Sequence, residues 1–377
     1  MDTKIRVLHY GALSETYGGV ESYIINQYRE MRKYNIQYDF LVNNSNEKLA
    51  YEDELKNYGC HIYRVWNGRR NGIIKHYYYL YKFFKTHKKK YDIAIGNYLD
   101  LQNIDFLIMA KLFGIKTCIA HAHAGNNLRR TKLWSFLVRL NRIILYFICN
   151  VLFSCSEDAG KWMFGNFLWN RKKKYIIING INIEKFLFDE KKRIYFRKMF
   201  NVEGALVIGH TGRLAEEKNH EFIIDIFYEL YKKKKNIYLF LIGKGILKNE
   251  IENKIKDLKL DKNIILLGER KDINELLNMM DIFLFPSKTE GLGISLIEAQ
   301  VNGLKCFTSK DVVPREVKIT KNIEFISLTE SANYWAERIL KNMEYNRNTV
   351  RKEMILSNYN INNNVHLLKN IFFKIKK

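Results

Sequence analysis

Short, nearly all-apolar runs alternate with amphipathic segments along the whole chain, and this alternation restricts the possible folds more than any other feature. A strand buried on both faces reads as a continuous apolar run, and a helix that covers such a sheet shows one apolar face. The pattern therefore predicts parallel sheets with helices on both faces. The predicted strands are 6–10, 38–42, 91–96, 116–122, 150–156, 174–180, 205–212, 237–243, 263–268, 281–286 and 305–309.

The alternation starts afresh near residue 205, which suggests more than one domain. A chain of 377 residues also exceeds the usual size of a single hydrophobic core. We therefore predict two doubly wound α/β domains that meet somewhere in 175–200.

The cysteine content and the apolar runs bear on the compartment. The chain has 5 cysteines, an odd number, and no CxxC pair. This argues against a disulfide framework or a structural zinc site and favours a reducing compartment. No signal peptide and no apolar run of about 18 residues is visible, so we expect no transmembrane helix.

Positive charge is concentrated in the first half of the chain. Residues 1–200 carry +17 of the total net charge of +23, and no acid occurs between Asp105 and Glu157. Such asymmetry points to an anionic partner: a membrane surface, a nucleic acid or a phosphorylated ligand. Cations alternate with aromatic and aliphatic residues in 75–92 and 126–150, which suits an anionic membrane surface. A core helix with a solvated basic face is the alternative.

Candidate binding residues follow the predicted strands. Parallel α/β sheets bind ligands beyond the carboxyl ends of their strands. The residues at those positions are Gly18, Gly19, His121, His123, Arg213, Lys218, Gly243, Gly245 and Glu290. Glycines allow close approach of a ligand to the backbone, although they also occur in ordinary turns.

Arg213 and Lys218 lie five positions apart after one strand. A guanidinium can bind two phosphate oxygens and an ammonium adds a point charge, so the two could neutralise a diphosphate without a metal. They could equally be surface cations of a basic protein.

The stretch "SKTEGLGISLIEAQ" (287–300) places two acids, Glu290 and Glu298, on either side of seven uncharged residues. If it were helical throughout, their backbones would lie roughly 12 Å apart. Such carboxylates fit an extended, hydroxyl-rich ligand held at two places, and N–H groups at 291–294 could hold phosphate between them. A nucleotide-sugar has that layout. A capped helix with a solvated Glu298 is the alternative.

His121 and His123 share one face of a strand, because residues two apart point the same way. No carboxylate or cysteine lies near them in the sequence, so we do not expect a metal site. A hydrogen-bonding or polarising role is the functional interpretation, and simple packing is the alternative.

Together these segments resemble the retaining GT-B glycosyltransferases of the group 1 (family 4) type, which build capsule, exopolysaccharide and O-antigen in bacteria. The most specific element is the E-x7-E motif in "PSKTEGLGISLIEA", and the likeness extends over nearly the whole chain. The resemblance implies two Rossmann-like domains facing across a cleft. The implied division is 1–180, 181–358 and a C-terminal helix at 359–377 that crosses back to the first domain.

The resemblance also implies residue roles. Arg213 and Lys218 would hold the donor diphosphate, Glu290 the donor sugar and Glu298 the ribose. Gly19 would belong to a loop that closes over the donor, and His123, or failing that His121, would lie beside the transferred sugar. The implied catalytic residues are His123, Glu290, Arg213 and Lys218. The implied donor-binding residues are Gly18, Gly19, Gly212, Arg213, Lys218, Gly243, Glu290, Gly291, Leu292, Gly293, Ile294 and Glu298.

The implied reaction is transfer of a hexosyl unit from a nucleotide-sugar, a UDP-sugar by preference, to a lipid-linked oligosaccharide or growing polysaccharide, with retained configuration. No metal or other cofactor and no nucleic-acid partner is expected. The expected location is cytoplasmic, peripheral at the inner face of the cell membrane. Alternatives are a sugar-nucleotide epimerase of the same architecture, a nucleic-acid-binding protein suggested by charge alone, and an inactive partner subunit. Lys244, where relatives often carry an acid, leaves the nucleotide base open.

Overall fold

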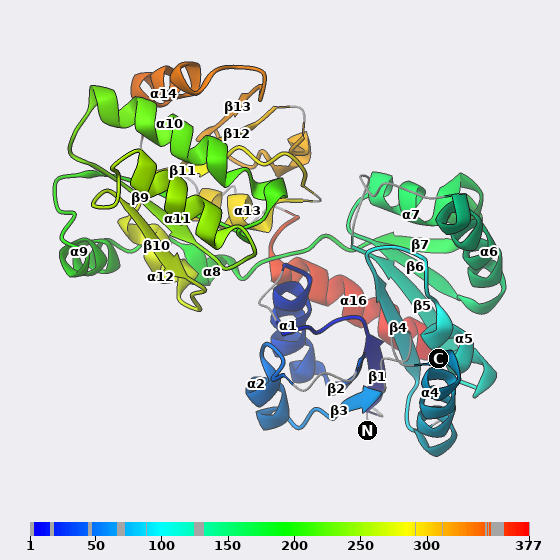
Figure 1. The fold of residues 1–377 in the computed structure, drawn as a ribbon. Coiled ribbons are helices and arrows are strands. Elements are labelled where there is room, and N and C mark those ends of the chain that lie inside the picture. Colours follow the sequence, from blue (N-terminus) through cyan, green and yellow to red (C-terminus); the bar gives the residue numbers. More distant parts are fainter. Residues whose placement is uncertain are drawn as a thin grey trace. The chain divides into compact units, whose positions relative to one another are not determined.

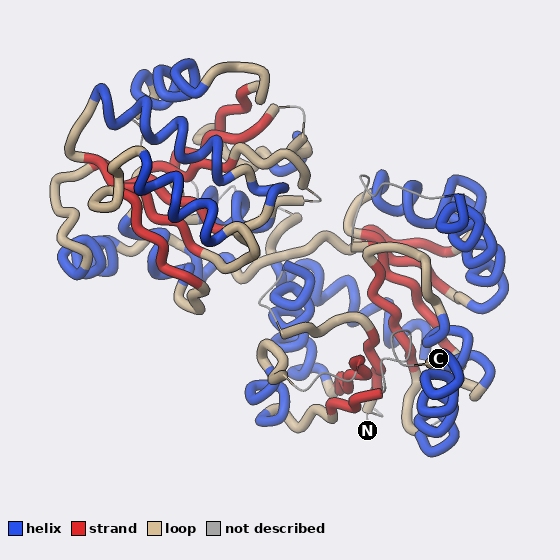
Figure 2. The backbone as a smooth tube through the Cα atoms, viewed as in Figure 1, coloured by secondary structure: helices blue, strands red, loops and turns tan. Residues whose placement is uncertain are grey.

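The computed structural model describes residues 4–15, 19–43, 47–65, 72–87, 89–123, 132–290, 292–310, 312–343, 345, 347 and 358–376. The chain divides into two units (Figures 1 and 2). The N-terminal domain is Met1–Ile181 with Ile361–Lys377, and the C-terminal domain is Asn182–Asn360. In each of them a parallel sheet is flanked by helices.

The N-terminal domain contains a seven-stranded parallel sheet in the order β3-β2-β1-β4-β5-β6-β7. Its strands are β1 (Ile5–Tyr10), β2 (Ile36–Asn43), β3 (Ile62–Val65), β4 (Ile93–Tyr98), β5 (Thr117–Ala122), β6 (Val151–Ser154) and β7 (Lys173–Ile176). Its helices include α1 (Gly19–Met31), α2 (Glu52–Asn57), α4 (Ile73–His87), α5 (Asp105–Leu112), α6 (Lys132–Ile148), α7 (Glu157–Arg171) and α16 (Ile361–Lys376).

Both faces of this sheet are buried, which explains why its strands are mostly apolar. Neighbouring residues of a strand point to opposite faces. Val7 of β1 belongs to the core formed with α1 and α16, and Leu8 to the core formed with α4 to α7. Helix α16 contacts α1 and β1, so the last helix of the chain packs on the first domain, as the resemblance implied.

The C-terminal domain contains a six-stranded parallel sheet in the order β10-β9-β8-β11-β12-β13. Its strands are β8 (Leu206–Thr211), β9 (Ile237–Ile242), β10 (Ile264–Gly268), β11 (Ile282–Phe285), β12 (Lys305–Ser309) and β13 (Ile323–Ile326). Its helices include α8 (Ile183–Phe186), α9 (Glu190–Met199), α10 (His220–Lys233), α11 (Lys248–Asp257), α12 (Ile273–Leu276), α13 (Ile294–Val301) and α14 (Ala332–Lys341). The two Rossmann-like sheets confirm the predicted fold class.

Every strand predicted from the sequence is present, with ends shifted by a few residues. The structure adds β3 and β13, which the sequence analysis missed. Both are edge strands of four residues, and each carries a charged residue, Arg64 or Glu324, among apolar ones. A strand of four residues with a charge in it lacks the continuous apolar run used for the prediction.

Two expectations drawn from composition can be compared with the structure. All five cysteines are free and buried. Within the described ranges, no helix has both the length and the apolar character needed to cross a membrane.

Candidate functional site

Lys218 and Glu290 form an ion pair at the carboxyl ends of β8 and β11. Their side chains are only 16% and 7% exposed, so the pair is largely shielded from water. Ser287 donates its hydroxyl to the same Glu290 oxygen at 2.9 Å. The Lys218 ammonium also lies 5.1 Å from the centre of the Phe285 ring. The two predicted site residues, 72 positions apart in sequence, are therefore in direct contact and held in place.

Arg213 lies in the same loop as Lys218 but has a different partner. Its side chain is 72% exposed and pairs with Glu217 at 2.9 Å. An exposed ion pair of this kind contributes at most about 1 kcal/mol, so Arg213 can leave Glu217 for a phosphate at little cost. The structure thus puts the two predicted cations on one loop, with Lys218 fixed and Arg213 exposed to solvent.

Glycines bring the loops after β8 and β9 into close contact. Gly243 has a φ of +148°, and a Cβ on it would lie 1.9 Å from the carbonyl oxygen of Gly212. A Cβ on Gly245 would lie 2.3 Å from the carbonyl oxygen of Leu214. A Cβ on Gly212 itself would lie 3.3 Å from Lys218 side-chain carbons. Close packing of the two loops therefore requires glycine at 243 and 245, and Gly212 lies against the Lys218 side chain.

The helix between the two acids of the E-x7-E motif starts later than a fully helical segment would require. Helix α13 begins at Ile294, after Gly293 with a φ of +74°, and Glu290 lies in the preceding loop. The segment is therefore helical only from Ile294 onward, so the spacing of a fully helical segment does not apply to the two acids. Gly293 provides no side-chain cap, and the N–H groups of the first turn of a helix attract anions. Leu292 is partly buried just before this terminus.

Glu298 lies in the second turn of α13 and is partly buried. Burial raises the pKa of its carboxyl from the usual value to about 8. Among the residues that the structure describes, no side chain is hydrogen-bonded to this carboxyl. The carboxyl is therefore only partly solvated, and it is suited to accept hydrogen bonds from a bound ligand.

The predicted histidines meet at the carboxyl end of β5. The ring centres of His121 and His123 are 3.9 Å apart, and both side chains are buried. Burial lowers the pKa of His123 to about 3 and that of His121 well below its ordinary value. Both rings are thus neutral near pH 7.

Two residues that the sequence analysis missed, His9 and Asn97, complete this cluster. Asn97 donates its amide Nδ2 to the carbonyl oxygen of Tyr10 at 3.0 Å, so its Oδ1 faces the Nε2 of His123 at 2.9 Å. His123 must donate from Nε2 to this acceptor, which leaves its Nδ1 as a hydrogen-bond acceptor. Burial also lowers the pKa of His9 to about 3. Both residues lie near the ends of predicted strands, and this position is the sequence feature that could have identified them.

The structure describes only some of the remaining predicted glycines. Gly19 is the first residue of α1, while Gly18 and Gly291 lie outside the described residues. Within the described ranges, no group of three or more His, Cys, Asp or Glu side chains is arranged to hold a metal ion. Lys244, the departure noted above, pairs with Glu269 at 2.8 Å.

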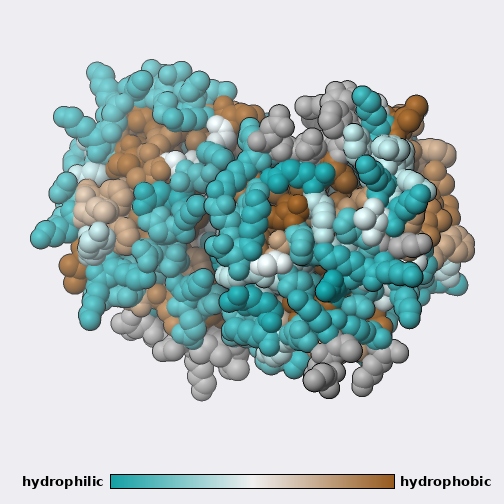
Figure 3. Space-filling model, turned by 90° about the horizontal axis from the view of Figure 1, so that it is seen from below, coloured by the Kyte–Doolittle hydropathy of each residue, from teal (hydrophilic) through white to brown (hydrophobic). Residues whose placement is uncertain are grey.

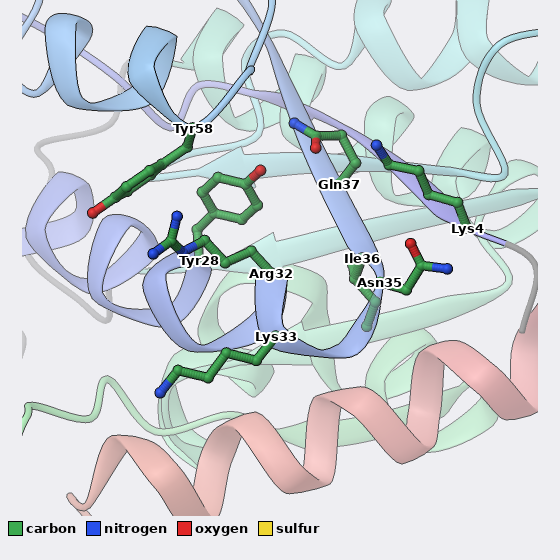
Figure 4. Close-up of a pocket in the computed structure, with 8 residues that line it drawn as sticks. All are labelled: Lys4, Tyr28, Arg32, Lys33, Asn35, Ile36, Gln37 and Tyr58. Carbon is green, nitrogen blue, oxygen red and sulfur yellow. The ribbon is translucent and has the colours of Figure 1, made fainter.

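Two pockets lie inside the individual domains. Figure 4 shows one of about 360 Å³ in the N-terminal domain, lined by Lys4, Tyr28, Arg32, Lys33, Asn35, Ile36, Gln37 and Tyr58. Because Ile36 is the first residue of β2, this pocket lies at the amino ends of the strands, away from His123. The other, of about 350 Å³, is lined by Asn219, Glu221, Phe222, Asp225, Lys288 and Leu328. Asn219 directly follows Lys218, so only the second pocket adjoins the candidate site.

Two Rossmann-like domains, with an E-x7-E segment paired to a basic loop in the second, are the arrangement of the GT-B fold. Residues 191–361, just under half of the chain, match the family model of glycosyl transferases group 1.

Individual relatives agree with this assignment. The chain is 28% identical over 365 residues to the Bacillus subtilis (strain 168) protein EpsF, whose name assigns it as a glycosyltransferase, and the match covers 94% of this chain and 93% of EpsF. It is 28% identical over 236 residues to an Escherichia coli UDP-Gal:alpha-D-GlcNAc-diphosphoundecaprenol alpha-1,3-galactosyltransferase, covering 61% of this chain and 60% of that protein. The fold resembles the crystal structure of Anabaena Alr3699/HepE in complex with UDP, with a TM-score of 0.76, 16% identity and coverage of 99% and 100%.

Proposed function

We propose that the protein transfers a hexosyl unit from a UDP-sugar to a hydroxyl of a lipid-linked or growing polysaccharide acceptor, with retention of configuration. The observation that carries the proposal is the shielded Lys218–Glu290 pair next to a helix terminus with no side-chain cap. The names of the relatives support the substrate classes: a UDP-sugar and a diphosphoundecaprenol-linked sugar in one, and bound UDP in another.

In this proposal the C-terminal domain stabilises the leaving diphosphate. The Lys218 ammonium, the mobilised Arg213 guanidinium and the first-turn N–H groups of α13 supply positive charge where negative charge develops. Because these groups already balance the charge, we expect the reaction to need no metal ion. Addition of EDTA should leave turnover unchanged, and a requirement for Mg²⁺ or Mn²⁺ would contradict this part of the proposal.

The two acids of the motif hold the ends of the donor. Glu290 would exchange part of its hydrogen bonding with Lys218 and Ser287 for hydroxyls of the sugar. Glu298 would accept hydrogen bonds from the ribose hydroxyls. His123 would accept a hydrogen bond from a sugar hydroxyl at Nδ1, since Asn97 occupies Nε2.

For the chemical step we propose attack on the same face from which the leaving group departs. The acceptor oxygen bonds to the anomeric carbon as the bond from that carbon to the phosphate oxygen breaks. The acceptor proton passes to the leaving phosphate, so no separate base is needed. The anomeric configuration of the product, read by NMR coupling constants, tests this step, and an inverted product would overturn it.

The first experiment is a calorimetric titration of the whole protein with UDP, GDP and ADP and their sugars. We expect saturable binding of UDP that is lost in Arg213→Ala and Glu298→Ala. A folded protein that binds none of the nucleotides would overturn the donor site. The family favours a transferase over the epimerase alternative, and incubation of the donor without acceptor checks this, since an epimerase would convert the sugar.

The proposal also places the protein at the inner face of the cell membrane, where a lipid-linked acceptor would be met. Cell fractionation tests this location, with release by high salt expected for a peripheral protein.

A further inference from the structure

Helix α6 has two apolar faces, and only one of them is covered. Val138 and Leu145 point into the domain core. The other face carries apolar side chains at steps of three and four residues, which places them in one row along the helix. This row, the α6 stripe, consists of Leu133, Phe136, Leu137, Leu140, Ile143 and Phe147, all of which are exposed.

The exposure is large for side chains of this kind. Phe136 is 63% exposed and Phe147 74%. Phe167 of the neighbouring helix α7 is 64% exposed, and its ring centre lies 5.7 Å from that of Tyr146 on α6. Apolar side chains gather at the right-hand edge of the space-filling view, on the side where α5 and α6 lie in Figure 1 (Figure 3). A contiguous apolar surface of this kind on a folded protein marks an interaction site.

Cations surround the stripe. Lys132 and Arg139 of α6 are exposed, and α6 itself contains no acid. On the side of α7, the Arg171 guanidinium lies 5.0 Å from the centre of the Phe167 ring, and the Lys172 ammonium lies 4.9 Å from that of Tyr146. Long basic side chains that run beside an apolar surface can place their charges among lipid headgroups while their stems stay apolar.

We propose that the α6 stripe, with Phe167, enters the interface of an anionic lipid bilayer with α6 lying along the membrane plane. The cations beside it fit anionic headgroups. The same cations disfavour a second copy of this chain, because residues 1–200 carry +17 and two such surfaces repel each other. A protein held at the membrane in this way would meet the lipid-linked acceptor of the proposed function. The observations behind this inference are independent of those at the donor site.

Sedimentation of the whole protein with vesicles tests the proposal. The probes are vesicles of phosphatidylcholine alone and of phosphatidylcholine with phosphatidylglycerol. We expect binding to the anionic vesicles, weakened about tenfold or more by the double change Phe136→Ser with Phe147→Ser, because two exposed aromatic side chains are lost. Lys132→Ser with Arg139→Ser should reduce the preference for phosphatidylglycerol. Ile194→Ser with Tyr195→Ser on α9, which removes residues of similar exposure, should bind as the unchanged protein does.

Any of three results with vesicles would overturn the proposal: no binding of the unchanged protein to anionic vesicles, equal binding by the Phe136/Phe147 variant, or an equal loss in the α9 control. A lipid-free dimer that this variant converts to a monomer would also overturn it, in favour of an interface between two copies. Calorimetry with UDP separates this inference from the proposed function. Retained UDP binding in a variant that no longer binds vesicles shows a folded donor site and isolates the effect to the stripe.

Discussion

The carboxyl ends of the two sheets carry different chemistry. In the C-terminal domain, Lys218 and Glu290 form a shielded ion pair. In the N-terminal domain, the buried rings of His9, His121 and His123 have pKa values far below neutrality, and burial is the main cause. A charge survives burial when it has a partner of opposite sign, and an imidazole without one is held neutral.

The difference separates two tasks in the proposed reaction. Charges that stabilise a leaving diphosphate belong to the C-terminal domain. Neutral acceptors and donors that orient a sugar belong to the N-terminal domain. Substitutions in the two regions should therefore affect different kinetic quantities.

The largest effect is expected at Lys218. Lys218→Met removes the ammonium that would face the leaving phosphate and leaves Glu290 without its ionic partner, so we expect kcat to fall about 10²–10³-fold. Steady-state kinetics with the UDP-sugar found by titration measures this, with Lys218→Arg as the matched variant that keeps the charge. If a folded Lys218→Met protein kept a kcat within a few fold of the original, Lys218 would not stabilise the leaving diphosphate as proposed.

Substitution of Gly243 tests whether the C-terminal site depends on close packing of the loops after β8 and β9. Gly243→Ala forces a methyl group against the Gly212 carbonyl, 1.9 Å away, at a φ of +148°, so we expect a loss of about 2–4 kcal/mol in the free energy of unfolding. Gly204→Ala is the control, because its φ is also positive, at +71°, but no atom lies within 4 Å of the added carbon. Urea denaturation compares the two. Equal losses would show that close packing of the loops is not what requires Gly243.

Substitution of His123 tests the proposed role of the neutral histidines in the N-terminal domain. We expect His123→Asn to lower kcat/KM by about tenfold, the effect of one lost hydrogen bond to the sugar, with UDP affinity unchanged. His121→Asn is the matched variant and decides which histidine faces the donor. If His123→Asn instead abolished UDP binding, His123 would contribute to nucleotide binding and not to sugar binding alone.

Glu298 should give donor binding a pH dependence. Its raised pKa of about 8 means that the ligand-free carboxyl is protonated at neutral pH, and ribose hydroxyls bind better to the ionised form. Binding should therefore release a proton, and UDP affinity should rise by up to roughly tenfold per pH unit between pH 6 and 8. Titrations in buffers of different ionisation heat measure the proton. Glu298→Gln should remove this component, and an unchanged pH profile in that variant would assign it elsewhere.

The same shift has a consequence for stability. The folded state binds the Glu298 proton more tightly than the unfolded state, so this group stabilises the fold at low pH. Its contribution declines from about pH 5 and is lost as the pH rises through about 8. Melting temperatures of the ligand-free protein and of Glu298→Gln, compared across this range, check the sign.

Much of the fold could be read from local patterns. Central strands such as β4 and β5 are buried along their whole length, so their apolar runs are long and easy to recognise. The edge strands β3 and β13 were missed because each has only four residues and one of them is charged. In the site, Glu290 and Lys218 were predicted from their positions after strands. Ser287, Asn97 and His9 were not, because nothing in the local sequence says which polar group they will contact.

The sequence by itself determined the two sheets, the glycines at the strand ends and the E-x7-E segment, since each depends on residues close together in the chain. The tertiary structure decided that Lys218 meets Glu290, that the surroundings of Glu298 raise the pKa of its carboxyl, and that Asn97 fixes the tautomer of His123. It also decided which apolar face of α6 is exposed, which the spacing of apolar residues in the sequence does not show. Burial and charge pairing depend on neighbours brought together by folding, and these set the protonation states on which the proposed chemistry rests.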